Sequence, residues 1–300
     1  MKLEKKMIKF SALGGLFFAV MGLAWGFMAK SSMILFDGLY SLISLFLSIL
    51  ALWVTNYIDK ADFKRFPFGK VMLEPLAVAF KSIVLIVMCT FTLYDAVTEI
   101  VAGGHVVDTS MAVAYSIVSS VGCIFVYVYM HQKGKKLCSD ILKAESNQWF
   151  MDSILSVAVL IGFIISAVIS TTSLAGLTRY VDPTMVIISS LIFIKIPTTA
   201  LFKSFREIVS GSADDNINNE IYTIVKDIEK EYNFADSITR VSKIGRELRI
   251  EIDFVFNEQS SLNELGQMDE VREQVYRNMT DIKLKKWLNV NFTGDRKWAI

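Results

Sequence analysis

Four oxygen-bearing side chains stand in two pairs at the edges of strongly apolar stretches. Asp37 and Ser41 are four residues apart in one stretch, and Gln148 and Asp152 are four apart in another. Residues at i and i+4 share one face of a helix, so each helix presents two oxygen groups one turn apart. If the two helices face each other, the four groups form an oxygen site with two negative charges. A divalent cation neutralises such a site.

Asp37 and Asp152 are notable because they occur in strongly apolar stretches. An ionisable group inside a membrane span is costly unless it is paired, hydrated or bound to an ion, so each is a functional candidate. The alternative is that each aspartate is a hydrogen-bond partner in helix packing. Asp37 and Asp152 lie at different depths in their apolar stretches. We expect them to meet if the helix of Asp152 begins early, within "KKLCSDILKAES", and if water enters beside it.

The composition predicts a membrane protein with a water-exposed part. With 53% hydrophobic and 20% charged residues, the chain is too apolar for a soluble domain and too charged to lie wholly in lipid. A helix needs about 20 residues to cross the hydrocarbon. Six apolar stretches meet this length, and the basic N-terminus is interpreted as part of a retained first span. They are residues 7–29, 33–57, 72–100, 112–130, 149–170 and 183–202.

The distribution of charge predicts the orientation. From residue 214 onward the chain holds 17 acidic and 13 basic side chains, whereas the preceding part holds 13 and 18. Lysine and arginine concentrate in the connections "DKADFKRFPFGK" and "HQKGKKLCSDILK". By the positive-inside rule both termini face the cytoplasm. We expect a multi-pass integral protein of the plasma (inner) membrane.

The C-terminal third predicts a small mixed domain. Residues 218–232 have the apolar periodicity of an amphipathic helix, and "SITRVSKIG" and "ELRIEIDFVF" are typical of strands. A helix over 262–279 and the strand "KKWLNVNF" complete an α-β-β-α-β order, which makes a ferredoxin-like sheet covered by helices on one face. The fold class is therefore an α-helical membrane protein, with six transmembrane helices in residues 1–207 and a cytoplasmic α+β domain in residues 208–300.

With this organisation the chain resembles the cation diffusion facilitator family along nearly its whole length. The resemblance implies a secondary transporter that exports a divalent metal cation by proton exchange, works as a homodimer, and binds its substrate ion at Asp37, Ser41, Gln148 and Asp152. The motifs that carry it are Asp37 with Ser41, Ala144 with Gln148 and Asp152, Pro67, Gly69 and Glu74 in "FPFGKVMLE", and "VDP" at 181–183.

The departures from the family pattern bear on the ion. Zinc-transporting members place a histidine at the position of Gln148 and often an aspartate at that of Ser41. Carboxylate, amide and hydroxyl oxygens favour harder ions such as manganese, magnesium or iron over zinc. Phe66 and Lys70 stand where some members build a zinc site from loop histidines, so that site is expected to be lost. The C-terminal domain contains no histidine or cysteine, and its zinc sites are expected to be lost as well.

The sequence bears on other classes of function as well. No P-loop, nucleophile elbow or HExxH motif occurs, so we expect no enzyme, no resident cofactor and no nucleic-acid partner; membrane lipid is the expected surrounding. A nontransporting regulatory or structural partner of an active relative, or a monovalent cation/proton exchanger, stays open as an alternative. His105 and His131 are interpreted as solvated surface groups. Lys81 and Lys195 are interpreted as stems that reach toward the interface, the alternative being an ion pair with Glu74.

Overall fold

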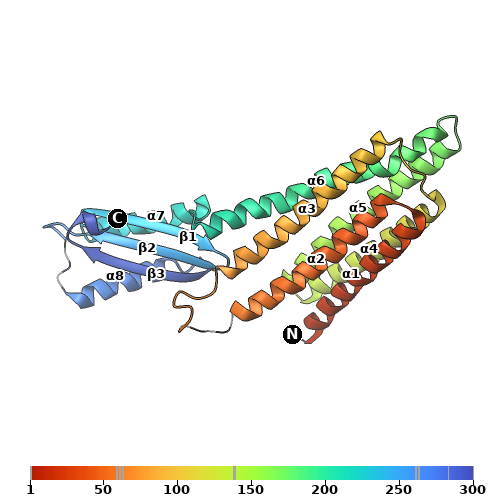
Figure 1. Ribbon diagram of the computed structural model, residues 1–300. Coiled ribbons are helices and arrows are strands. Elements are labelled where there is room, and N and C mark those ends of the chain that lie inside the picture. Colours follow the sequence, from red (N-terminus) through yellow and green to blue (C-terminus); the bar gives the residue numbers. More distant parts are fainter. Residues whose placement is uncertain are drawn as a thin grey trace. The chain divides into compact units, whose positions relative to one another are not determined.

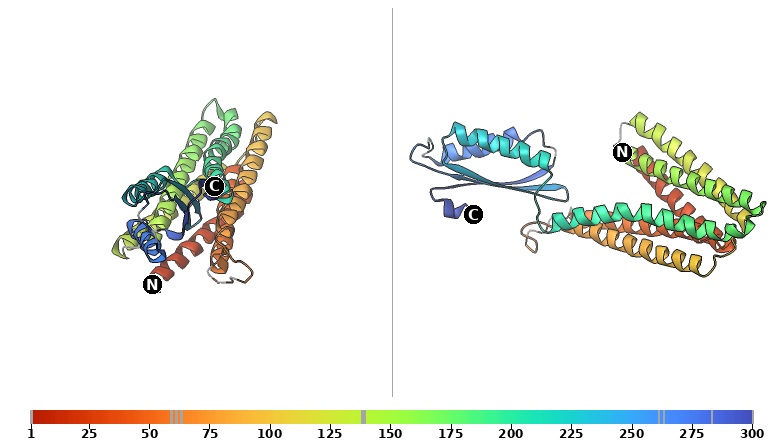
Figure 2. Two further views of the ribbon diagram at one scale, coloured as in Figure 1. Left: turned by 90° about the vertical axis from the view of Figure 1, so that its left-hand side faces the viewer. Right: turned by 90° about the horizontal axis from the view of Figure 1, so that it is seen from above.

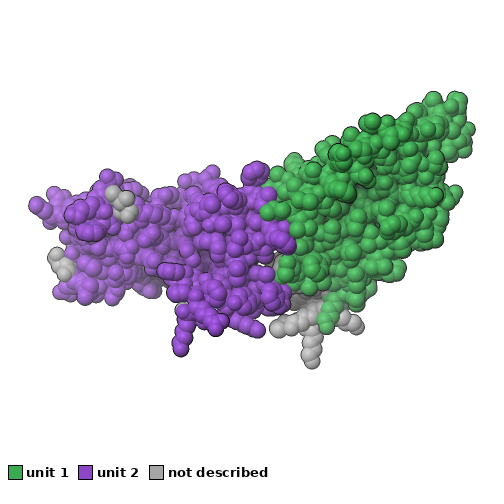
Figure 3. Space-filling view, viewed as in Figure 1, with its two compact units in different colours: residues 1–50, 81–199 green, residues 51–80, 200–300 purple. Residues whose placement is uncertain are grey.

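The structure is a computed structural model that describes residues 2–58, 60, 62, 64–137, 140–260, 262, 264–282 and 284–299 (Figures 1 and 2). Packing divides it into two compact units, coloured separately in Figure 3. The first comprises residues 1–50 and 81–199, and the second comprises residues 51–80 and 200–300. The second unit thus includes the ends of three long helices. The division of the chain at residue 207, which was drawn from composition, stays a prediction.

Long helices occupy the first 208 residues, in the order that the apolar stretches predict. They are α1 Lys2–Ala29, α2 Ser32–Ile58, α3 Leu73–Val101, α4 Thr109–Leu137, α5 Asp140–Ser170 and α6 Val181–Ile208, with a short 3₁₀ turn, η1 Ala175–Tyr180, before α6. Helix α5 begins at Asp140, nine residues before its apolar stretch. The early start that brings Asp152 deeper into its helix is therefore present.

The lengths and composition of these helices suit a membrane. Among the residues that the structure describes, five helical segments are long and apolar enough to cross one: 9–29, 73–101, 109–133, 148–170 and 175–208. Helix α2 contributes a shorter apolar segment, Ser32–Leu47, in that count, and its backbone continues helically to Ile58. Twenty-seven residues at 1.5 Å each exceed the roughly 30 Å of hydrocarbon. The predicted spans are thus helices in the structure.

The first unit is apolar outside and partly polar inside. Large apolar side chains such as Phe17, Phe46 and Phe91 are exposed, whereas many serines are buried between helices. Helices α1, α4 and α5 pack against one another, and α3 runs beside α6 (Figures 1 and 2). A hydrogen bond of 3.4 Å between Thr92 and Ser190 joins α3 to α6. This distribution is what lipid as the solvent requires.

The second unit contains the predicted α-β-β-α-β domain. Its elements are α7 Asp215–Glu231, β1 Asp236–Ile244, β2 Glu247–Val255, α8 Leu265–Asn278 and β3 Lys285–Thr293, followed by the 3₁₀ turn η2 Arg296–Trp298. Strand β2 lies between β1, which is antiparallel to it, and β3, which is parallel. Parallel neighbours need a crossover connection, and α8 provides it.

One apolar core holds this domain together. Leu248, Ile250, Ile252 and Phe254 alternate along β2 and are buried against α7 and α8, which cover one face of the sheet (Figure 2). The two helices are placed slightly differently from the prediction. Helix α7 begins three residues earlier than the amphipathic pattern, and α8 begins at Leu265. The two-residue periodicity of β2 therefore predicts the buried face of the sheet correctly.

Candidate metal-ion site

Glycines bring α1 and α2 close together next to Asp37. A Cβ atom at Gly38 would lie 2.8 Å from the backbone nitrogen of Leu23, and one at Gly22 would lie 3.1 Å from the Cα of Gly38. Real side chains do not tolerate such distances, so only glycine permits this approach. Gly22 and Gly26 are one helical turn apart, and Gly26 likewise packs against Leu35 of α2. The segment of α2 that carries Asp37 is thereby fixed against α1.

The carboxylate of Asp37 is bound to α4. Tyr115 donates a hydrogen bond of 3.2 Å from its hydroxyl to Asp37 Oδ2. Tyr115 is 2% exposed, so this contact lies inside the helix bundle. The Asp37 side chain itself is half-buried. A buried donor on the neighbouring helix orients one carboxylate oxygen and leaves the other available to a ligand.

Asp152 approaches the same region from α5. It lies four residues before Ser156, so the two side chains share one face of α5. Ser156 is hydrogen-bonded to Ser119 and Cys123 of α4, the helix that also carries Tyr115, the donor to Asp37. The helices of the two aspartates therefore both contact α4.

A seam of hydroxyl and thiol groups continues from this point between α4 and α5. Ser119 and Ser156 are hydrogen-bonded at 3.2 Å, and Ser156 donates to the Cys123 sulfur at 3.7 Å. Sequence reasoning did not select Tyr115, Ser119 or Cys123. The sequence does contain a signal for them: Tyr115, Ser119 and Cys123 are spaced four residues apart, which places them on one face of a helix.

The remaining predicted ligands are less enclosed. Ser41 is half-buried and Gln148 is exposed, on α2 and α5 respectively. The neighbour of Gln148, Trp149, is buried and donates from its indole to Ser11 Oγ at 2.8 Å, which fixes this turn of α5 against α1. Ala144, the first residue of the α5 motif, lies outside the residues whose side chains are described. The four-ligand set stays a prediction.

The interpretation of His105 as a solvated surface group is wrong. Its imidazole is 27% exposed, its Nδ1 lies against Glu99 Oε1, and its Nε2 is 2.6 Å from the Lys30 carbonyl and 3.8 Å from Asp182 Oδ2. These partners come from α3, the α1–α2 turn and the start of α6, so the contacts are not visible in local sequence. His131 is also engaged, with its Nδ1 3.4 Å from Ser146 Oγ.

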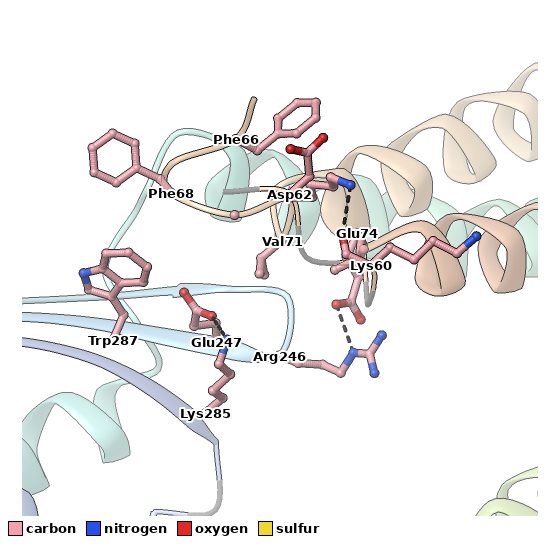
Figure 4. A pocket seen from close by; sticks show the side chains of 13 residues that line it. Lys60, Asp62, Phe66, Phe68, Val71, Glu74, Arg246, Glu247, Lys285 and Trp287 are labelled. Atoms are coloured by element: carbon pink, nitrogen blue, oxygen red, sulfur yellow. Dashed lines mark hydrogen bonds and ion pairs between the residues drawn. The ribbon is translucent and has the colours of Figure 1, made fainter. Parts of the chain in front are cut away.

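The loop before α3 was expected to lack a metal site, and it holds a buried ammonium instead. Lys70 is 7% exposed, donates to the Lys60 carbonyl at 3.0 Å and lies 4.1 Å from the centre of the Tyr57 ring. A pocket of about 430 Å³ adjoins it in the second unit, with the aromatic rings of Phe66, Phe68 and Trp287 on its wall (Figure 4). A fixed positive charge at this position opposes cation binding.

The same pocket shows how Glu74 is used. Its carboxylate lies 3.2 Å from Arg246, at the turn between β1 and β2, and Glu247 pairs with Lys285 at 3.0 Å (Figure 4). Glu74 thus pairs with an arginine of the same unit, and the alternative of an ion pair between Glu74 and Lys81 or Lys195 stays a prediction. Lys195 is exposed on α6.

These observations describe a helical membrane protein with a carboxylate, that of Asp37, beside a seam of hydroxyl and thiol groups. The comparisons with known proteins give its class. Residues 8–209 match the family described as the cation efflux transmembrane domain. The chain therefore belongs to the cation diffusion facilitator family. Its members are transporters of metal cations and not enzymes, so this multi-pass membrane protein is a metal cation exporter.

One curated relative carries a more particular name. The chain is 22% identical over 243 residues to the manganese efflux system protein MneP of Bacillus subtilis (strain 168). The alignment covers 81% of this chain and 79% of that protein. The similarity thus extends beyond the membrane helices into the C-terminal domain.

Proposed function

We propose that the chain exports a divalent cation, with manganese first among the candidates, in exchange for protons. The ion binds between α2 and α5 at Asp37, Ser41, Gln148 and Asp152. The observation that supports the proposal is that α4 contacts both helices: Tyr115 donates to Asp37, and Ser119 and Cys123 bond to Ser156, one turn after Asp152. Two carboxylates at one point in a membrane bundle need a positive partner, and a divalent cation supplies two charges at once.

The donor atoms available favour a hard ion. Besides the two carboxylates, the ligands that the sequence register offers are neutral oxygens, those of Ser41 and Gln148. Manganese and magnesium accept such ligands more readily than zinc does. The name of the Bacillus subtilis relative supports manganese.

Proton exchange follows from the same charges. When the cation leaves, two neighbouring carboxylates shielded from water repel each other, and binding a proton relieves that repulsion. The hydroxyl of Tyr115 already contacts Asp37 and stabilises its charged form. Each transport cycle would thus load metal on the deprotonated pair and release it as the pair takes up protons. We further propose that the chain works as a homodimer with both termini in the cytoplasm.

Transport by purified protein in liposomes tests this function. Proteoliposomes with an acidic interior are expected to take up external Mn²⁺, measured with an entrapped metal-sensitive dye, and to lose the uptake when the pH gradient is collapsed with a protonophore. Asp37→Asn and Asp152→Asn, which keep size and remove charge, are expected to abolish uptake. Glu251→Gln, on the exposed surface of the C-terminal sheet, is the matched control. Uptake that ignores the pH gradient contradicts the exchange mechanism.

Ion competition tests the oxygen site separately. Wild-type uptake of Mn²⁺ is measured against magnesium, iron, cobalt, zinc, cadmium and sodium, and repeated with Gln148→His. The substitution introduces an imidazole, which zinc favours, so its preference is expected to move toward zinc. A wild type that prefers zinc contradicts the argument from ligand hardness. Protein that transports nothing alone, but does so with an active relative, indicates a regulatory subunit.

A further inference from the structure

The first turn of α2 is held by a carboxylate from α6. Asp182 is 1% exposed and accepts three hydrogen bonds: from Ser31 Oγ at 2.6 Å, from the Ser32 amide at 2.7 Å and from the Met33 amide at 3.3 Å. The first amides of a helix have no partner within the helix, so a buried helix start needs an acceptor from elsewhere. Asp182 supplies it across 149 or more residues of sequence.

Two further groups close the surroundings of this carboxylate. Ser32 Oγ donates to Glu99 Oε2 of α3 at 3.3 Å, and His105 lies between Glu99 and Asp182. His105 Nε2 also reaches the Lys30 carbonyl in the α1–α2 turn. The start of α2 is therefore tied to α3, to α6 and to the loop after α3. We call Glu99, His105 and Asp182, with Ser31 and Ser32, the Asp182 cluster.

A short, continuous segment of α2 connects the Asp182 cluster to the proposed ion site. Asp37 follows Ser32 by five residues of one uninterrupted helix, a rise of about 7.5 Å. Apolar packing also holds this stretch, because Met33, Ile34 and Phe36 are almost fully buried. The close contact at Gly38 holds α2 against α1, and the hydrogen bonds to the first amides of α2 tie it to α6 as well.

We infer that Asp182 is a positioning residue for metal transport: its hydrogen bonds to the start of α2 set the height and rotation of that helix, and so place Asp37 opposite Asp152. The inference rests on the proposed ion site. Ser31 has a smaller part, since its hydroxyl also accepts from the Ile34 amide at 3.1 Å and caps the helix locally. Asp182 is not a ligand in the proposed ion site, and its effect on Asp37 is transmitted through α2.

The experiment compares transport kinetics of full-length variants in proteoliposomes. Asp182→Ala removes all three bonds, and is expected to raise the KM for Mn²⁺ about tenfold, the scale of a lost helix cap. Asp182→Asn retains a carbonyl acceptor and is expected to recover part of the wild-type KM. Ser190→Ala is the matched control: Ser190 is on the same helix, is also 1% exposed and bonds to α3. Its KM is expected to equal that of the wild type.

A second readout addresses the helix itself. Amide hydrogen exchange at Ser32 and Met33 is expected to accelerate in Asp182→Ala and to stay slow in Ser190→Ala, with equal amounts of folded protein. Unchanged exchange in Asp182→Ala overturns the inference, because the bonds then do not protect the helix start. If Asp182 were purely structural, Asp182→Ala would lower the yield of folded protein and leave the KM of the folded fraction unchanged, which also overturns the inference.

The outcomes separate this inference from the proposed function. If Asp37→Ala loses transport while Asp182→Ala keeps the wild-type KM, the ion site stands and the positioning role is wrong. If Asp37→Ala transports as the wild type does, the proposed ion site is wrong and the positioning role falls with it. Loss of transport in Asp37→Ala, a raised KM in Asp182→Ala and partial recovery in Asp182→Asn support both.

Discussion

The two units of this protein differ in what they expose and in how polar their interiors are. Each encloses an apolar cluster, but the helices of the first unit also enclose many serines and the carboxylate of Asp182, and they expose phenylalanine and isoleucine. In water, burial of a leucine stabilises the fold; in lipid it contributes little, because the surroundings are equally apolar. A buried aspartate therefore points to function in the first unit and to structural pairing in the second.

The largest effect expected from this comparison is at the proposed ion site. Asp37→Ala should reduce Mn²⁺ transport by about 30-fold or more, because losing one member of a buried charge pair costs about 2–5 kcal/mol in ion binding. Transport into proteoliposomes measures the loss, and the thermal midpoint in detergent measures stability. If Asp37→Ala lowers the thermal midpoint but the folded variant transports Mn²⁺ as the wild type does, Asp37 acts in helix packing.

Two helical glycines sharpen the same contrast. Gly38→Leu places side-chain atoms where the backbone of Leu23 already lies, so overpacking is expected to cost about 1–3 kcal/mol and to displace Asp37. Gly266→Ala, at the start of α8, meets no atom within 4 Å and is the control. The thermal midpoint and Mn²⁺ uptake are measured for both. If Gly38→Leu matches the wild type in both, the close approach of α1 and α2 is not needed.

An aspartate of the C-terminal sheet gives the opposite expectation to Asp37. Asp253 is 5% exposed, lies 2.7 Å from Arg240 Nη1 and accepts from Asn291 Nδ2 at 2.9 Å. Asp253→Ala should destabilise the domain by about 1–3 kcal/mol through lost charged hydrogen bonds. The KM for Mn²⁺ should not change. A raised KM with normal stability would show that this domain's carboxylates take part in ion handling.

The smallest effect concerns the donor to Asp37. Tyr115→Phe removes one hydroxyl from the bundle and should raise the KM for Mn²⁺ about fivefold, since the net value of a hydrogen bond is about 1 kcal/mol. Tyr94→Phe, on the exposed face of α3, serves as a comparison for general loss of a hydroxyl. Equal kinetics for Tyr115→Phe and wild type would mean that Tyr115 does not orient the carboxylate.

The sequence predicted the helices and strands well because both depend on local periodicity. Apolar length identified the spans, and alternation along β2 identified the buried face of the sheet. The start of α5 was placed too late because hydropathy reports contact with lipid, whereas a helix continues through the polar residues from Asp140 onward. The boundaries of α7 and α8 also differ from the prediction by a few residues. Helix α8 begins at a capping box formed by Glu264 and Gln267, and α7 extends three residues before its apolar pattern.

The site was only partly accessible from sequence. Asp37 and Asp152 stood out because charges are rare in hydrocarbon. Tyr115 and Ser119 did not, because single hydroxyls in a span are common and usually bond to their own helix. The Asp182 cluster depends on contacts between residues up to 151 positions apart, which no local pattern reveals. His105 was misjudged for this reason.

The hydroxyl pair between α4 and α5 has a property that its distances imply. Ser119 and Ser156 can each donate to the other, and while Ser156 donates to Cys123 the bond between the serines must run from Ser119. When the thiol donates instead, both bonds reverse by rotation of hydrogens alone, with no heavy atom displaced. The interface between these helices can thus invert its dipole as charge is gained or lost nearby, while its packing stays the same.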